Sequence, residues 1–133
     1  MRHDKNHVYA TVFKGLRTTI YRVTDITKGK EWYAEAFGTQ PYFDEPFYVG
    51  FEIGGYELGV QAVPEGTEHP GQGAVETYWG VEDIDEVYNY LLSIGATAFR
   101  PPASVGDPIK VAVVKDPWGN MLGLIYNPLF KAQ

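Results

Sequence analysis

The chain contains one pattern twice, and this internal repeat restricts its fold more than any other feature of the sequence. Residues 16–38 read LRTTIYRVTDITKGKEWYAEAFG, and residues 74–96 read AVETYWGVEDIDEVYNYLLSIGA. Each stretch has a run of strand-forming residues, then Val-x-Asp, then a helical pattern that ends near a glycine. Val23 and Asp25 recur as Val81 and Asp83, 58 residues further on. A repeated unit of this length predicts two similar modules.

Each module is predicted to contain one amphipathic helix. In the second copy, Asp83 stands at the capping position and Gly95 follows the last apolar residue. In the first copy, either Asp25 or Thr27 caps the helix, and Gly38 ends it. The apolar faces consist of Trp32, Tyr33, Ala36 and Phe37 in the first helix and of Ile84, Val87, Tyr88, Leu91 and Leu92 in the second.

Three short strands are predicted after each helix, so that each half reads β-α-β-β-β. Gly54-Gly55 predicts a tight turn between the last two strands of the first copy. The matching Leu58-Gly59 and Leu122-Gly123 pairs are 64 residues apart, which predicts a longer loop in the second copy. We expect strands in residues 41–48, 49–53, 56–63, 96–100, 110–114 and 121–126, and the longer loop in residues 100–108.

The whole chain, residues 1–133, is predicted to form a single α+β domain. One helix can cover only one face of a four-stranded sheet, so the other face must pack on something or enclose a cavity. We therefore expect two βαβββ modules that form a curved mixed sheet around a cavity. The expected parts are an arm (1–15, with residues 8–13 as a further candidate edge strand), the first module (16–63), a Pro- and Gly-rich linker (64–73), the second module (74–128) and a tail (129–133).

Composition excludes several classes of function. The net charge of −6 and the scattered basic residues argue against a partner that is a nucleic acid or an anionic membrane. The chain has no cysteine, which excludes disulfides, thiolate nucleophiles and cysteine-bound metals. The first residues lack the apolar core of a signal peptide, and no apolar run is long enough to span a membrane. We expect a soluble, cytoplasmic protein.

The order and duplication of these motifs resemble those of the vicinal oxygen chelate superfamily. This group includes glyoxalase I, extradiol dioxygenases, fosfomycin-resistance enzymes and bleomycin-binding proteins. The resemblance covers roughly residues 16–128, and its most specific parts are TYWGVEDIDEVYNYLLSIGATA and VKDPWGNMLGLIYNP. It implies the two-module fold of the glyoxalase, bleomycin-resistance and dihydroxybiphenyl dioxygenase type, and it also implies a homodimer.

The resemblance also places metal ligands, and this chain departs from that pattern. Metal-using members take one ligand from the first strand and one from the last strand of each module. The corresponding positions here are Thr18, Gly59, Glu76 and Gly123. Glycine has no side chain and a threonine hydroxyl is a poor ligand, whereas a divalent transition metal needs three or four donors. We therefore expect no metal and no other cofactor. A divalent metal that also involves Glu57 is the alternative.

Strand alternation predicts which side chains share a face with these four positions. Tyr21, Val23, Trp79 and Val81 should face the helices. The opposite face, which should line the cavity and bind a ligand, is predicted to contain Thr18, Ile20, Arg22, Glu57, Gly59, Gln61, Glu76, Tyr78, Met121, Gly123 and Ile125.

Several of these residues allow two interpretations. Arg22 pairs with Glu57 or Glu76, or the polar face lines a wet cavity. Gly59 and Gly123 leave room for a ligand, or they are sheet bends or points of close approach. Glu76 is the candidate catalytic residue, because a semi-apolar pocket would raise its pKa and make it a general base. The aromatic stretch at residues 42–51 serves core packing, an interface or a ligand platform.

Three functions remain open. The first is a metal-independent protein that binds a small organic molecule, with a preference for cationic or hydrogen-bond-donating ligands that Arg22 offsets. The second is an enzyme, either a metal-dependent lyase or dioxygenase or an isomerase that uses Glu76 as its base. The third is a structural or regulatory module.

Overall fold

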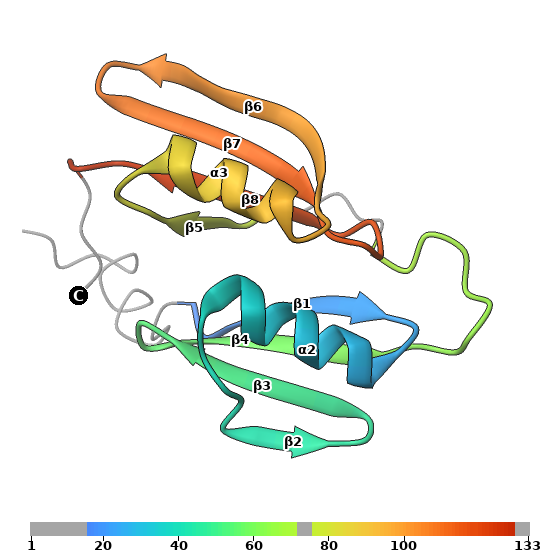
Figure 1. The fold of residues 1–133 in the computed structure, drawn as a ribbon. Helices are drawn as coiled ribbons and strands as arrows, with labels where there is room; N and C mark the ends of the chain where they lie inside the picture. Colours follow the sequence, from blue (N-terminus) through green and yellow to red (C-terminus); the bar gives the residue numbers. More distant parts are fainter. Residues whose placement is uncertain (1–15, 72–75, 130–133) are drawn as a thin grey trace, which may run out of the picture.

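The computed structural model describes residues 16–71 and 76–129, and within them the predicted repeat is confirmed. Each module forms one four-stranded sheet and one helix (Figure 1). The candidate edge strand at residues 8–13 lies outside the described residues. The elements are β1 (Thr18–Val23), α2 (Ile26–Phe37), β2 (Phe43–Glu45), β3 (Tyr48–Ile53), β4 (Tyr56–Ala62), β5 (Tyr78–Gly80), α3 (Ile84–Ser93), β6 (Thr97–Gly106), β7 (Ile109–Lys115) and β8 (Met121–Tyr126).

The two sheets have the same topology. The strand orders are β1-β4-β3-β2 and β5-β8-β7-β6. In each sheet the first strand pairs in parallel with the last, and the remaining pairs are antiparallel. The parallel pair needs a crossover connection, which the helix and the two middle strands of each module supply. The structure therefore confirms an α+β fold with two open, curved mixed sheets.

The helices begin and end where the sequence predicts. Of the two candidate caps for α2, the structure selects Asp25, whose side chain accepts a hydrogen bond from Lys28 N at 3.1 Å. Gly38 ends α2 in the left-handed conformation. Asp83 caps α3 in the same way, accepting from Glu86 N at 3.0 Å. These bonds satisfy backbone donors that a helix start leaves free.

The prediction of a loop at residues 100–108 is wrong. Residues up to Gly106 continue β6, and the pairing of β6 with β7 shifts register between Ala98 and Arg100, between Arg100 and Ala103, and again before Gly106. Bulges place extra residues within a paired strand, so the second copy lengthens its hairpin instead of adding a loop. Tyr48 is also reassigned, because it begins β3 and does not end the preceding strand.

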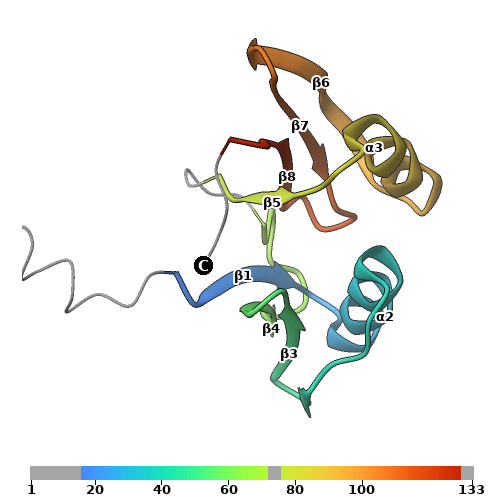
Figure 2. The same cartoon turned by 90° about the vertical axis from the view of Figure 1, so that its left-hand side faces the viewer.

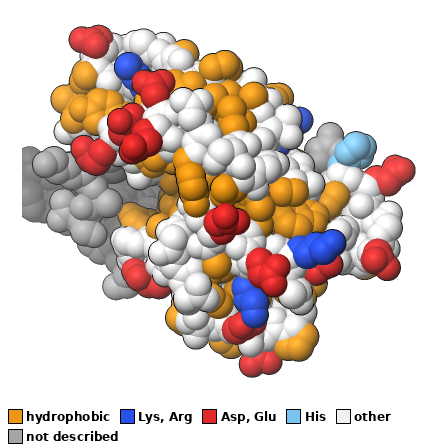
Figure 3. All heavy atoms as spheres, in the orientation of Figure 1, with side chains coloured by type: hydrophobic (Ala, Val, Ile, Leu, Met, Phe, Trp, Pro, Cys, Tyr) orange, Lys and Arg blue, Asp and Glu red, His pale blue; other side chains and the backbone are white. Residues whose placement is uncertain are grey.

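The helices of both modules pack together on one side of the sheets (Figures 1 and 2). Trp32 Nε1 of α2 donates to Ile94 O at 2.9 Å, and the ring of Phe37 meets Trp79 edge-on at 5.3 Å between centroids. Tyr21 and Val23 are buried in this core, as the alternation of β1 predicts. On the helix side of the surface, hydrophobic side chains follow the junction of the modules (Figure 3). The two modules therefore share one core.

Repeat-related residues meet along the line between β1 and β5. Thr19 Oγ1 and Thr77 Oγ1 lie 3.2 Å apart, and Trp79 Nε1 donates to Tyr21 Oη at 2.9 Å. Both pairs are 58 residues apart in sequence, the spacing of the repeat. Residues related by the repeat can touch only near a local twofold axis. A local twofold axis of the domain therefore passes through the β1–β5 line, which is called the seam below.

A buried polar network joins the turn after β7 to the first module. The Asp116 carboxylate accepts hydrogen bonds from Tyr33 Oη at 2.6 Å, from Trp118 N at 2.9 Å and from both nitrogens of Asn120. Asn120 then binds the backbone of β1, donating to Arg22 O at 2.9 Å and accepting from Arg22 N at 3.2 Å. Burial raises the pKa of Asp116, and the hydrogen bonds from Tyr33 and Asn120 oppose that rise.

Gly29 sits within α2 although glycine costs a helix about 1 kcal/mol relative to alanine. A Cβ atom at this position would lie 2.9 Å from Val23 Cγ2 and 3.1 Å from Val60 Cγ1. Both valines are fully buried. The glycine therefore lets α2 approach the sheet closely. Neither α2 nor α3, the helices of the described residues, is long and apolar enough to cross a membrane.

Replacing Asn120 with alanine is expected to lower the free energy of unfolding by about 3 kcal/mol, since it removes two neutral hydrogen bonds and one to a carboxylate. The measurement is chemical denaturation followed by circular dichroism. Asn89→Ala, at an exposed position of α3, is the control and should change stability by less than about 0.5 kcal/mol. A loss below about 1 kcal/mol for Asn120→Ala would contradict a joining role of the network.

Gly29→Ala is expected to destabilise the protein by about 1–2 kcal/mol, because the added methyl group overpacks the core. Helix propensity alone predicts the opposite sign. Thr27→Ala, at an exposed site of the same helix, tests propensity without overpacking. If thermal denaturation shows Gly29→Ala to be as stable as the parent or more so, close packing of α2 is not the reason for the glycine.

Candidate functional site

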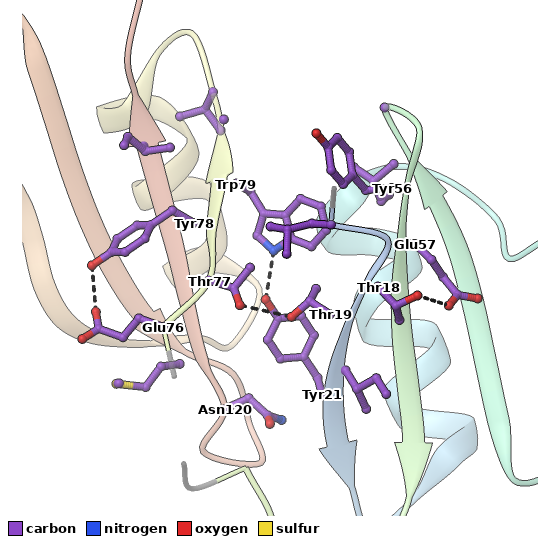
Figure 4. A pocket seen from close by; sticks show the side chains of 18 of the residues that line it. Thr18, Thr19, Tyr21, Tyr56, Glu57, Glu76, Thr77, Tyr78, Trp79 and Asn120 are labelled. Carbon is purple, nitrogen blue, oxygen red and sulfur yellow. Dashed lines mark hydrogen bonds between the residues drawn. The ribbon is translucent and has the colours of Figure 1, made fainter. Parts of the chain in front are cut away.

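A cleft of about 1260 Å³ follows the seam between the two modules. In Figure 4, β5 and β8 form one side of it, and β1 and β4 form the other. Aromatic, aliphatic and charged side chains share its wall, a mixture typical of sites for small organic molecules. The lining residues come from positions 16–22, 53–54, 56–57, 71, 76–82, 120–121 and 125–128.

The structure brings together eight of the eleven residues that strand alternation placed on the cavity face. Those that line the cleft are Thr18, Ile20, Arg22, Glu57, Glu76, Tyr78, Met121 and Ile125. Gly59, Gln61 and Gly123 do not line it. Gln61 pairs with Arg22 on the neighbouring strand and is exposed, whereas both glycines are buried.

Tyrosine rings explain why the two glycines do not reach the cleft. A Cβ atom on Gly59 would lie 2.0 Å from Tyr48 Oη, and one on Gly123 would lie 2.7 Å from Tyr78 Cδ1. The phenol group of Tyr48 therefore lies against Gly59, and the Tyr78 ring lies against Gly123 together with the backbone oxygen of Thr77. Of the two interpretations, close approach is correct, and the space above the glycines is filled by the protein itself.

Glu57 is held by three hydroxyl groups from three different segments. Tyr42 Oη donates to Glu57 Oε2, while Thr18 Oγ1 and Tyr48 Oη approach Oε1 at 2.8 and 3.0 Å. The hydrogen bond from Tyr42 is the main cause that lowers the pKa of Glu57, and those from Thr18 and Tyr48 act in the same direction. Burial, with the Glu57 contact, raises the pKa of Tyr48 to about 12. At neutral pH this cluster is a carboxylate bound by neutral hydroxyls.

Glu76 has different partners on the other wall. Tyr78 Oη donates to Glu76 Oε1 at 2.7 Å, and Arg100 Nη1 reaches the same oxygen at 2.8 Å (Figure 4 shows the tyrosine contact). Both partners lower the pKa of Glu76, Tyr78 first. The expected rise in pKa is therefore wrong, because Glu76 is exposed and faces a cation. Arg100 is thus the ion-pair partner of Glu76, a role that one of the two interpretations gave to Arg22.

The donor set at the four resemblance-implied metal positions does not fit a divalent transition metal. Thr18 already donates its hydroxyl to Glu57, Glu76 is paired with Arg100, and Gly59 and Gly123 offer no side chain. Within residues 16–71 and 76–129, no group of three or more His, Asp or Glu side chains is close enough to hold a metal ion. Such a site needs three or four convergent donors.

The sequence missed several residues that shape the site. Tyr42 and Tyr48 contact Glu57, Arg100 contacts Glu76, and Tyr56 and Asn120 line the cleft. A signal existed for the tyrosines, since the aromatic stretch at residues 42–51 included a ligand platform among its interpretations. Phe51 of that stretch belongs to the core, whereas Tyr42, Phe43 and Phe47 are exposed. No pattern pointed to Arg100, because a bulge sets its direction.

Solved structures with the same fold are numerous. A glyoxalase-related enzyme from Fulvimarina pelagi aligns with a TM-score of 0.74 and 18% identity over 91% of this chain and 94% of its own. A member of the glyoxalase/bleomycin resistance protein/dioxygenase superfamily from Sphaerobacter thermophilus aligns with a TM-score of 0.70 and 21% identity over 87% and 99%. At such identities the likeness concerns the fold alone. No curated protein matches the chain.

The sequence also matches a family model over most of its length. The matching model is described as the Glyoxalase/Bleomycin resistance protein/Dioxygenase superfamily and covers residues 15–124. This range contains both βαβββ modules except the end of β8. The chain therefore belongs to the glyoxalase/bleomycin resistance protein/dioxygenase superfamily, as its repeat and its motifs predicted.

Proposed function

We propose that the protein binds a small organic molecule in the seam cleft and does so without a bound metal ion. The observation that carries the proposal is the cleft itself, whose volume of about 1260 Å³ is ample for a small ligand. Tyr56, Tyr78 and Trp79 supply aromatic surface to its wall, and Glu57 and Glu76 supply fixed polar groups. Sites that bind small organic ligands usually combine aromatic surface with a few oriented polar groups.

The side-chain chemistry of the wall favours binding over metal-dependent or base catalysis. Each glutamate is ionised and engaged by its own partners, so neither is a poised general base. The glycines at the metal positions are covered by tyrosine rings. The lack of cysteine in the sequence is compatible with the reducing cytoplasm, where we propose that the protein acts.

The same proposal includes a homodimer. The sheet faces opposite the helices, called the outer faces below, carry exposed apolar side chains such as Ile20 and Phe43, 48% and 40% exposed. Exposed apolar surface on a sheet face favours an interface with another protein. The family resemblance favours a second copy of the chain as the partner.

Ligand binding is tested by blocking the cleft from within. Gly80 lines the cleft, and a Cβ atom there would meet no atom within 4 Å, so Gly80→Phe adds bulk without a clash at its base. In ligand-observed NMR with a library of aromatic fragments, the parent should give hits whose affinity falls at least about tenfold in Gly80→Phe. Asn89→Phe, on the helix side, is the matched control and should keep them.

Elemental analysis of the same samples tests the metal-free part of the proposal. Metal content should stay well below one ion per chain, and EDTA should leave the fragment hits unchanged. Near-stoichiometric zinc, nickel, manganese or iron would overturn the metal-free reading. Hits that persist in Gly80→Phe would overturn the seam cleft as the binding site.

The dimer is tested by light scattering. The mass in solution should be twice the 14.9 kDa of one chain. Phe43→Lys places a charge on the outer face of β2, outside the cleft lining, and should shift the mass toward the monomer. Val105→Lys, at an exposed position near the end of β6, is the control and should not. A monomeric parent protein would refute the dimer.

A further inference from the structure

Two glycines face each other across β3 and β4 and form a shallow depression in the outer face of the first sheet. Gly50 and Gly59 are register partners, and both are buried. A Cβ atom on Gly50 would lie 2.6 Å from Glu57 Oε2 and 3.2 Å from Tyr42 Cε1. A Cβ atom on Gly59 would meet Tyr48 Oη at 2.0 Å. Glycine lowers the stability of a strand, so its presence at both positions needs a reason. The reason is the close approach of Glu57 and Tyr42 to Gly50 and of Tyr48 to Gly59, which leaves no room for a Cβ atom.

The groups on this depression are called the Glu57 platform: Thr18, Tyr42, Tyr48 and Glu57. They are fixed from four segments, namely β1, the residues before β2, β3 and β4. Each of the three hydroxyl groups has one proton, and each donates it to the Glu57 carboxylate. The remaining hydrogen-bonding capacity of the platform consists of oxygen lone pairs. The platform can therefore accept hydrogen bonds from a ligand but has no hydroxyl proton left to donate.

The Glu57 carboxylate forms no ion pair with a Lys or Arg side chain of the described residues. Among the described residues the ion pairs are Lys30 with Asp44 and Arg100 with Glu76, and neither involves Glu57. Glu57 and Glu76, two of the three glutamates that line the cleft, therefore differ, because Glu76 is paired with Arg100 whereas Glu57 accepts hydrogen bonds from neutral hydroxyl groups. The register partner of Glu57 is Glu52, a further carboxylate.

Arg22 shares the outer face of β1 but lies at the other end of the strand from Thr18. The register partner of Arg22 on β4 is Gln61, four residues along the strand from Glu57, and Arg22 forms no ion pair with Glu57. Tyr42 is 65% exposed as a whole residue, which leaves aromatic surface available beside the carboxylate. A cation gains from an aromatic face as well as from a carboxylate.

From this placement we propose that the Glu57 platform is the subsite for a cationic, hydrogen-bond-donating group of the ligand, such as an amidinium or a protonated amine. The proposal rests on ligand binding in the cleft, whose wall includes Thr18 and Glu57. A planar cation with several N–H donors fits a surface that only accepts hydrogen bonds. The balanced Glu76–Arg100 pair on the opposite wall has no such preference for positive charge.

The test compares three probes of nearly one shape, namely benzamidinium, neutral benzamide and benzoate, by ligand-observed NMR and calorimetry on the full chain. Benzamidinium should bind the parent at least about tenfold more tightly than benzamide, with benzoate weakest. Glu57→Gln should abolish that preference. Glu31→Gln makes the same charge change on exposed α2 and should retain it. Gly50→Ala disturbs the platform without changing any charge and should reduce the preference, which guards against a folding defect in Glu57→Gln.

The outcomes separate this proposal from the proposed function. If benzamide or benzoate binds the parent as tightly as benzamidinium does, and Gly80→Phe blocks it, the cleft binds ligands but the cationic subsite is refuted. If the preference for benzamidinium survives Glu57→Gln in a folded protein, the subsite is also refuted. If none of the three probes binds and the fragment library gives no hits, both proposals fail.

Discussion

The contact between Asp116, Asn120 and the backbone of β1 is the constraint on which the relative placement of the modules depends. The sheets do not pair with each other, so β1 and β5 meet through side chains. In place of strand pairing, the side chain of Asn120 forms hydrogen bonds with both the backbone N–H and the backbone C=O of Arg22. The Asp116 carboxylate holds Asn120 in position by accepting a hydrogen bond from its side chain, and it also accepts one from the hydroxyl group of Tyr33 in α2. A buried carboxylate is tolerated because four donors surround it. Asn120 also lines the cleft, so the network that joins the modules forms part of the cleft wall.

The backbone of the domain is pseudosymmetric, but the chemistry of the cleft is not. Gly59 and Gly123 occupy equivalent positions, and a tyrosine ring covers each of them. The two rings belong to strands that are not equivalent in the repeat, because Tyr48 is in β3 and Tyr78 is in β5. As a result one glutamate is surrounded by hydroxyl groups and the other by a hydroxyl group and an arginine. A duplicated fold can thus present two walls of different charge to one ligand.

The fold could be predicted from the sequence because its signals are local or periodic. Caps, helical faces and strand alternation depend on residues within a few positions of each other, so the helices and the buried faces of β1 and β5 were predictable. The partners of Glu57 and Glu76 depend on cross-strand register and on the bulges of β6, which no local pattern encodes. An ion pair of Arg22 with Glu57 or Glu76 was one interpretation because these side chains share a sheet face. Sharing a face does not show how far apart two residues lie along the strands. The loop predicted at residues 100–108 failed for the same reason, since a spacing difference does not tell an insertion from a longer hairpin.

The lack of a side chain at position 59 and the presence of the Glu57 platform have one physical cause. At position 59, where the family resemblance places a ligand, any side chain would begin 2.0 Å from Tyr48 Oη. A carboxylate side chain at position 59 would displace the Tyr48 ring, whose hydroxyl group donates to Glu57. The contacts of Glu57 above Gly50 would then change as well. The two arrangements exclude each other, because the depression that receives the phenol is the space that a ligating side chain would need. A ligating side chain at position 59 therefore requires the removal of Tyr48 as well as the replacement of Gly59.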